Sequence, residues 1–198
     1  GIEHGTVTAV LDGNQIEITT YRVDGDYRDG RRPEEVVFTR SIEEDLLRRD
    51  FTVNAIAWDP INATLTDPYD GCKDLQRGIL KAVGDAHARF QEDGLRVLRA
   101  IRFATTLDFE IDEATEQGAI AAIDTLKKIA AERIQVELLK TLSNDKVARG
   151  LSLIRRFNVT EICFPNQPTL PSDHWHRLCE AMSTCDGHVT SRLALLLH

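Results

Sequence analysis

Long apolar runs are missing from this sequence of 198 residues. No window approaches the roughly 20 apolar residues that a membrane-spanning helix needs. The opening stretch GIEHGTVTAV also lacks a basic segment followed by a long apolar one. We therefore expect no membrane span, no membrane partner and no secretion. A hydrophobic share of 42% and a charged share of 28% are typical of a globular protein with a real core.

Paired cysteines and an excess of positive charge are missing too. The four cysteines show neither C-x-x-C spacing nor dense pairing, so the sequence supports neither a zinc site nor a disulfide framework, and a reducing cytoplasm fits best. The net charge is −8. A protein that holds long duplex DNA by neutralising phosphates is usually basic, so we expect no DNA partner. Any nucleic acid would have to meet a local cationic face.

The periodicity of the sequence changes along the chain and predicts an α+β fold. Strand-like segments at 6–11 and 15–21 flank the turn sequence DGN, a strand is expected at 36–38, and a second hairpin is expected at 55–67. The charged stretch at 22–35 indicates a solvated loop. Ser41 begins a capping-box pattern for a short helix. From about residue 72 the pattern is mainly helical, with a short extended exception at 79–83.

The stretch FQEDGLRVLRAIRF, residues 90–103, predicts one amphipathic helix with an apolar side and a cationic side. Asp93 and Arg96 are one turn apart on this helix, so their side chains can lie alongside each other. A fixed acceptor beside a fixed donor can imitate a nucleobase edge, because cytosine and adenine each offer an amino donor next to a ring nitrogen acceptor. The alternative is a solvated helix face with an intrahelical ion pair.

The decamer RRDFTVNAIA, residues 48–57, places polar side chains where an apolar segment begins. The forked guanidinium groups of Arg48 and Arg49 suit phosphate, and Thr52 and Asn54 offer short donors and acceptors for a ribose hydroxyl. The alternative is a basic helix end with Asp50 as a local ion partner.

Four segments in this order resemble the class II tRNA nucleotidyltransferase and bacterial poly(A) polymerase family. They are HGTVTAVLDGNQIEITTYR, EEDLLRRDFTVNAIAWDP, DPYDGCKDLQRGILKAVGDAHARFQEDGLRVLRAIRF and ERIQVELLK, and they span roughly residues 3–142. The resemblance implies the remnant of a nucleotidyltransferase β-sheet head at 1–71, an all-helical neck that binds nucleobase and RNA at 72–150, and the start of a helical body or HD-like domain at 151–198.

The resemblance also implies roles for individual residues. Arg49 and Asn54 would contact the triphosphate and ribose, with Asp50 nearby, and Asp93 and Arg96 would form the protein template for cytosine or adenine. Arg99 and Arg102 would serve the nucleotide phosphates or the fold of the pocket, and Glu17 would be the carboxylate near the catalytic metals. Apart from the resemblance, Arg133 and Lys140 on a later helix are candidates for contact with RNA or phosphate. For Arg133 and Lys140, with Glu137 between them, an intrahelical salt-bridge role is equally open.

The implied reaction adds C and A from CTP and ATP to the 3′ end of tRNA, with Mg²⁺ ions held by carboxylates. The family's G-G-x-V-R-D segment and Asp-x-Asp pair precede the HGTVT strand and are absent from these residues, so we expect an N-terminally incomplete chain. Asp24-Gly25-Asp26 is interpreted as loop, and His198 as an ordinary residue rather than a metal ligand. A poly(A) polymerase and a catalytically incomplete nucleotide- and RNA-binding fragment are the alternatives.

Other polar residues are assigned structural roles. His174 and His176 lack a third metal ligand and are expected to be surface or packing residues. Asp67 and Asp70 are expected to form a turn and cap a helix.

Overall fold

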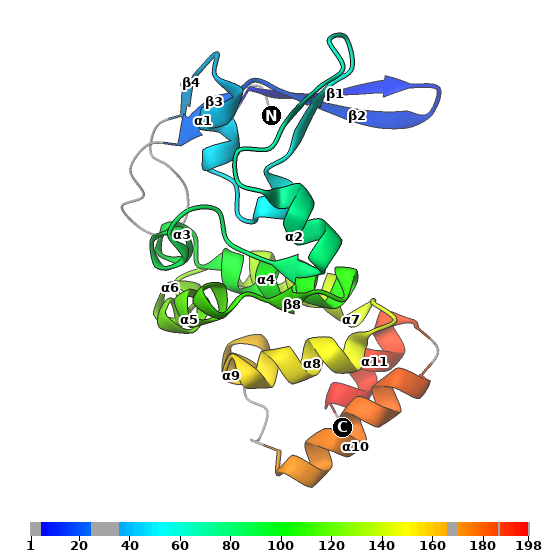
Figure 1. Cartoon of the computed structure of the whole chain (residues 1–198). Helices are drawn as coiled ribbons and strands as arrows, with labels where there is room; N and C mark the ends of the chain where they lie inside the picture. Colours follow the sequence, from blue (N-terminus) through cyan, green and yellow to red (C-terminus); the bar gives the residue numbers. More distant parts are fainter. Residues whose placement is uncertain (1–4, 25–35, 166–169, 186, 198) are drawn as a thin grey trace.

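The computed structural model describes residues 5–24, 36–165, 170–185 and 187–197. Figure 1 shows a strand-rich part (residues 5–66) at one end and a helical part (residues 71–197) beneath it. This arrangement confirms the predicted α+β class. Much of the predicted loop at 22–35, with Gly25 and Asp26, and the expectation for His198 fall outside the described residues.

The strand-rich part consists of antiparallel strand pairs. Strands β1 (Thr6–Leu11) and β2 (Asn14–Thr19) form the predicted hairpin, and its Asp12–Gly13 turn has positive φ angles of 50° and 80°. Strands β5 (Ala57–Asp59) and β6 (Thr64–Thr66) form the second predicted hairpin. The strand expected at 36–38 is β4 (Val36–Phe38). The prediction that the loop begins at residue 22 was wrong. Residues Arg22–Asp24 form strand β3, because they pair with β4 in an antiparallel ladder.

The β1–β2 hairpin has one apolar face and one polar face. Val7 is paired with Ile18, so these side chains share a face, and Thr8 is paired with Glu17 on the opposite face. Both strands are almost entirely exposed. The hairpin reaches sideways from the strand-rich part (Figure 1).

Helix α1 (Ile42–Leu47) begins where the sequence predicts, with the Ser41 hydroxyl accepting a hydrogen bond from the Glu44 amide. Asp45 on this helix is buried and accepts hydrogen bonds from the Arg22 amide, from Arg48 and from Arg49. Burial by itself would raise the pKa of Asp45, but these hydrogen bonds and the charge of Arg48 lower it below its ordinary value. The carboxylate therefore anchors β3 to α1.

The decamer joins the two parts of the molecule. Phe51 is fully buried, and its ring lies 6.4 Å from that of Phe90 and 5.8 Å from that of Phe103, between centroids. The backbone beside it runs antiparallel to residues 81–83, because the Thr52 amide donates to the Lys81 carbonyl and the Val83 amide donates to the Asp50 carbonyl. The 3-10 turn Thr52–Asn54 follows.

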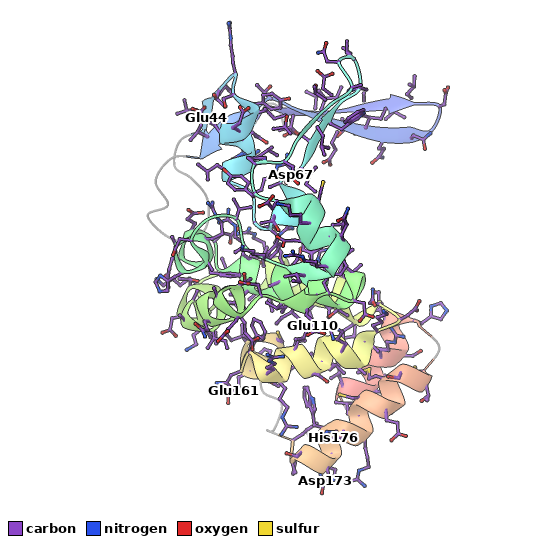
Figure 2. All side chains as sticks on the ribbon, in the orientation of Figure 1. Glu44, Asp67, Glu110, Glu161, Asp173 and His176 are labelled. Atoms are coloured by element: carbon purple, nitrogen blue, oxygen red, sulfur yellow. The ribbon has the colours of Figure 1, made fainter. Side chains whose placement is uncertain are left out.

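Helix α2 (Gly71–Arg77) follows β6 and is held by a predicted turn residue. The Asp67 carboxylate accepts hydrogen bonds from the amides of Gly71 and Cys72 at 2.7 and 2.9 Å. Figure 2 labels Asp67 between the strand-rich part and the helices. Strand β7 (Ile79–Leu80) confirms the extended exception and pairs in parallel with β8 (Glu110–Ile111).

The single helix predicted over 90–103 is two helices in the structure. Helix α3 (Ala86–Glu92) ends at Asp93, which is extended (φ −142°, ψ 106°), and helix α4 (Leu95–Leu107) begins after Gly94. A Cβ atom on Gly94 would lie 2.5 Å from the Leu126 amide nitrogen and from the Thr125 carbonyl carbon. Close packing against this backbone therefore explains why the chain breaks its helical path at a glycine.

The other helices are α5 (Glu113–Ala121), α6 (Ile123–Leu126), α7 (Ala131–Leu142), α8 (Val147–Arg156), α9 (Thr160–Cys163), α10 (Ser172–Thr184) and α11 (Val189–Leu197). Helices α5 to α8 pack around α4, and the helices that follow pack on α7 and α8. The large hydrophobic core contains the apolar face of α4 together with apolar residues of α7 and α8. Helix α10 was not predicted, because the prolines before it indicate only a connector. None of the helices among the described residues is long and apolar enough to cross a membrane.

We predict that Phe51→Ala lowers the free energy of unfolding by about 3–5 kcal/mol, because it opens a cavity between Phe90 and Phe103. Urea unfolding followed by circular dichroism measures this change. Ile61→Ala is the control, since Ile61 is 90% exposed and its truncation should change stability by less than about 0.5 kcal/mol. Equal effects of the two substitutions would contradict the packing role of Phe51.

We predict that Asp45→Asn reduces the dependence of stability on pH in the acidic range. The pKa of Asp45 is lowered in the folded state, so its stabilising contribution is present above the unfolded pKa of about 3.9 and is lost as pH falls through the folded value. Thermal unfolding from neutral pH downward measures the effect. The expected result is a loss of stability at neutral pH that shrinks at low pH; a loss of constant size would rule out this linkage.

Candidate functional site at the boundary of the two parts

Asp50 is the carboxylate on which several polar residues converge. Its Oδ1 accepts hydrogen bonds from the Phe51 amide at 2.9 Å and from the Asn54 side-chain nitrogen at 3.1 Å. Its Oδ2 accepts from Nε and Nη2 of Arg99 at 2.7 and 2.6 Å. Asp50 is 7% exposed. The strand-rich part and α4 are therefore joined by a largely buried ion pair.

Arg49 and Asn54, expected to contact triphosphate and ribose, lie near each other. Arg49 donates from Nη2 to the Asp45 carboxylate at 3.2 Å and from Nη1 to the Asn54 carbonyl at 3.3 Å. Its side chain is 44% exposed, and the Asn54 amide is directed at Asp50. Arg49 therefore has donors near solvent while its orientation is fixed by the neighbouring Asp45.

Arg96 is buried and the Asp93 side chain is 18% exposed, and each is held by other residues rather than by the expected pair. Asp93 accepts from the Leu95 amide at 3.0 Å and from Arg133 Nη2 at 2.9 Å. Arg96 donates from Nη1 to Glu92 at 2.5 Å. The prediction that the two groups orient each other on one helix was wrong, because the chain leaves the helix at Asp93 and its carboxylate meets α7.

Arg96 also connects α4 to the decamer. Its Nη2 donates to the carbonyl of Arg48 at 3.0 Å, and its Nη1 donates to the carbonyl of Arg89 at 2.7 Å. Arg96 and the residues around Arg49 therefore belong to one region of the structure.

Arg99 and Arg102 are neutralised by carboxylates from other elements. Glu137 on α7 is 4% exposed, and its Oε2 accepts from Arg102 Nε at 2.5 Å. Its Oε1 lies 4.0 Å from both Arg99 Nη1 and Lys140 Nζ. The Arg102 guanidinium also stacks over Phe103, 3.9 Å from the ring centroid. We call Asp50, Asn54, Arg99, Arg102 and Glu137 the boundary cluster.

Glu137 is the residue in this cluster that sequence reasoning missed. The pattern Arg133, Glu137, Lys140 indicates ion pairs within one helix. In the structure the principal partner of Glu137 is Arg102, from another helix, while Arg133 pairs with Asp93. A buried carboxylate that faces several cations orients them, because leaving any of these charges unpaired is costly.

No described contact joins Glu17, His174 or His176 to the boundary cluster. Glu17 is exposed on the polar face of the β1–β2 hairpin, and the described residues contain no group of three or more His, Cys, Asp or Glu side chains that could hold a metal ion. The residues described here thus do not form a metal centre on their own. His174 and His176 are exposed on α10, and His176 lies at the end of the molecule away from the strand-rich part (Figure 2).

Comparison with known proteins finds two family models that match parts of the chain. Residues 1–81 match the family described as poly A polymerase head domain, and residues 108–170 match the probable RNA and SrmB-binding site of polymerase A. A CCA-adding enzyme of Pediococcus pentosaceus is 47% identical over 163 residues, which are 82% of this chain and 41% of that protein. The chain thus spans about two fifths of that relative's length.

Solved structures give the same grouping. The Bacillus stearothermophilus CCA-adding enzyme in complex with CTP is 35% identical, with a TM-score of 0.76 over 94% of this chain and 43% of that one. A tRNA nucleotidyltransferase complexed with a primer tRNA and an incoming ATP analog is 26% identical, with a TM-score of 0.79 over 98% of this chain and 58% of that one. With these sequence and structural matches, the chain belongs to the tRNA nucleotidyltransferase and poly(A) polymerase family.

Proposed function

We propose that the protein containing this chain is a template-independent RNA nucleotidyltransferase that adds C and A from CTP and ATP to the 3′ end of tRNA. The observation that carries the proposal is that Asp93 and Arg96 are each fixed by separate partners, with Arg96 donating a hydrogen bond to the carbonyl of Arg48. Relatives that bind CTP, an ATP analog and a primer tRNA support the choice of substrates.

Asp93 and Arg96 would select the nucleobase. Cytosine and adenine each present an amino donor beside a ring nitrogen acceptor, which match a carboxylate acceptor and a guanidinium donor. Uracil and guanine present the reverse order of donor and acceptor, so a carbonyl oxygen would face the carboxylate and an N–H group would face the guanidinium.

The decamer and α4 would hold the rest of the nucleotide. Arg49 has exposed donors for the triphosphate, and Asn54, tied to Asp50, would meet the ribose. Arg99 is one-third exposed and would meet phosphate at the edge of the boundary cluster, whereas the more buried Arg102 would hold the shape of the pocket. The transfer joins the RNA 3′ oxygen to the α-phosphorus and releases pyrophosphate.

Nucleotidyltransferases of this family generally use a divalent metal ion, and we propose that the ion is Mg²⁺. It would stabilise negative charge on the phosphates when bound. Glu17 would supply one carboxylate ligand and lies on the polar face of its hairpin, but the described residues add no second and third ligand beside it.

Lys140 is 57% exposed and would contact RNA phosphate. Arg133, the other residue expected to reach RNA, has its guanidinium directed at Asp93 instead. We propose a cytoplasmic enzyme with neither a membrane nor a DNA partner, and domain boundaries near residues 71 and 150.

Poly(A) polymerase activity is the second candidate, because both matched family descriptions name that polymerase. The two activities differ in their use of CTP. A protein that adds only a run of A to RNA would support the second candidate.

We predict that Asp93→Ala in the full-length protein abolishes or scrambles the choice of nucleotide, because the acceptor for the amino group is removed. Incorporation of each labelled nucleotide into tRNA that lacks its 3′ end measures the effect. Ile61→Ala, exposed in the β5–β6 hairpin, is the matched control and should keep the wild-type order of C before A. An unchanged preference in Asp93→Ala would contradict the template role.

We predict that Arg49→Gln lowers kcat/KM for CTP and for ATP by the same factor, about ten- to a hundredfold, because one charge-assisted contact to phosphate is lost. Steady-state kinetics with both nucleotides measures it. The change should leave the C-to-A preference intact, since phosphate carries no base identity. A loss confined to one nucleotide would argue against phosphate binding.

A further inference from the structure

The Asp93 carboxylate is held in a fixed direction by two contacts. Its Oδ1 accepts from the Leu95 amide at 3.0 Å, which is a local bond at the start of α4. Its Oδ2 accepts from Arg133 Nη2 at 2.9 Å, and Arg133 is 40 residues away in the chain. The close approach of Gly94 to the α6 backbone further limits the movement of the peptide between them. The direction of this acceptor therefore depends on a side chain from α7.

Arg96 is held by a separate set of groups. Glu92 and the carbonyls of Arg89 and Arg48 accept its hydrogen bonds. The described side-chain partners of Arg96 therefore do not include Arg133 or the Asp93 carboxylate. A change at Arg133 should therefore disturb the acceptor of the proposed base-reading pair and leave its donor in place.

Helix α7 provides a firm base for Arg133. It packs against α4 in the hydrophobic core through Leu138 and Leu142, and Glu137, one turn after Arg133, forms an ion pair with Arg102 of α4. The side chains of Arg133 and Asp93 are 34% and 18% exposed, so their pair is only partly screened by solvent.

We propose that Arg133 is a positioning residue that sets the direction of the Asp93 carboxylate and thereby restricts the enzyme to cytosine and adenine, the bases that present an amino donor beside a ring nitrogen acceptor. The inference rests on the proposed function. It assigns to Arg133 a role that differs from direct contact with RNA phosphate. If the carboxylate turns away, the site loses its fixed acceptor, and uracil and guanine are no longer rejected as strongly.

The test uses the full-length protein and tRNA lacking its 3′ end. We measure kcat/KM for CTP, ATP, UTP and GTP, and KM for the tRNA, in the wild type and in Arg133→Gln and Arg133→Lys. Arg133→Gln should reduce the preference for CTP over UTP, and for ATP over GTP, by about tenfold or more, with KM for tRNA changed less than about twofold. Arg133→Lys, which keeps the charge, should retain part of the preference.

Arg156→Gln is the matched control. Arg156 also forms an ion pair with a carboxylate, that of Glu116, but on α8 and α5 and with no described contact to Asp93. This substitution should leave the base preference at the wild-type value, so a general effect of removing an arginine ion pair is separated from the effect at Asp93.

A double-mutant cycle provides the decisive readout. If Arg133 acts through Asp93, adding Arg133→Gln to Asp93→Ala should cause no further loss of base preference. Arg133→Lys replaces Arg133→Gln in the cycle if the latter fails to fold, as judged by circular dichroism. A raised KM for tRNA with unchanged base preference, or losses that add in the double mutant, would overturn the inference. If the wild type itself adds neither C nor A, the proposed function fails instead, which is a distinguishable result.

Discussion

The ion pair between Asp50 and Arg99 is the constraint on which the boundary of the molecule depends. It joins residues 49 positions apart, and Asp50 is largely buried. Removing the cation would leave an uncompensated buried carboxylate and would strongly destabilise the fold. The pair therefore ties the position of α4 to that of the decamer. Asn54 takes its orientation from the same carboxylate, and Glu137 takes up the charge of Arg102 beside it. The polar character of the decamer thus has a structural basis as well as the proposed role in binding.

Features that depend on neighbouring residues could be predicted from the sequence. The Asp12–Gly13 turn and the Ser41 cap follow from backbone conformations and hydrogen bonds within a few residues, and both are present. The break at Asp93–Gly94 depends on the α6 backbone, which is about thirty residues further along the chain, so the local periodicity favours one continuous helix. The start of helix α10 could not be predicted, because the prolines before it are typical of a connector.

In the candidate site, the sequence likewise predicts which residues are present but not which side chains pair with one another. The sequence indicates which residues carry suitable chemistry, and most of them lie at the boundary of the two parts. Their partners could not be predicted, because a guanidinium group reaches several carboxylates and only the packing of α4 against α7 decides which. Arg133 meets Asp93 and Arg102 meets Glu137, although spacing along α7 favours pairs within that helix. The assigned roles of these residues stay predictions.

Asp93 lies before α4 and Arg99 lies within it, so the number of residues between them is as important as their types. Each residue added to a helix turns everything beyond it by about 100°. One inserted residue between Gly94 and Arg99 would leave the Asp93 end in place yet swing the Arg99 guanidinium away from Asp50. Homologues that preserve this arrangement should therefore tolerate changes of amino-acid type in this stretch more readily than insertions or deletions.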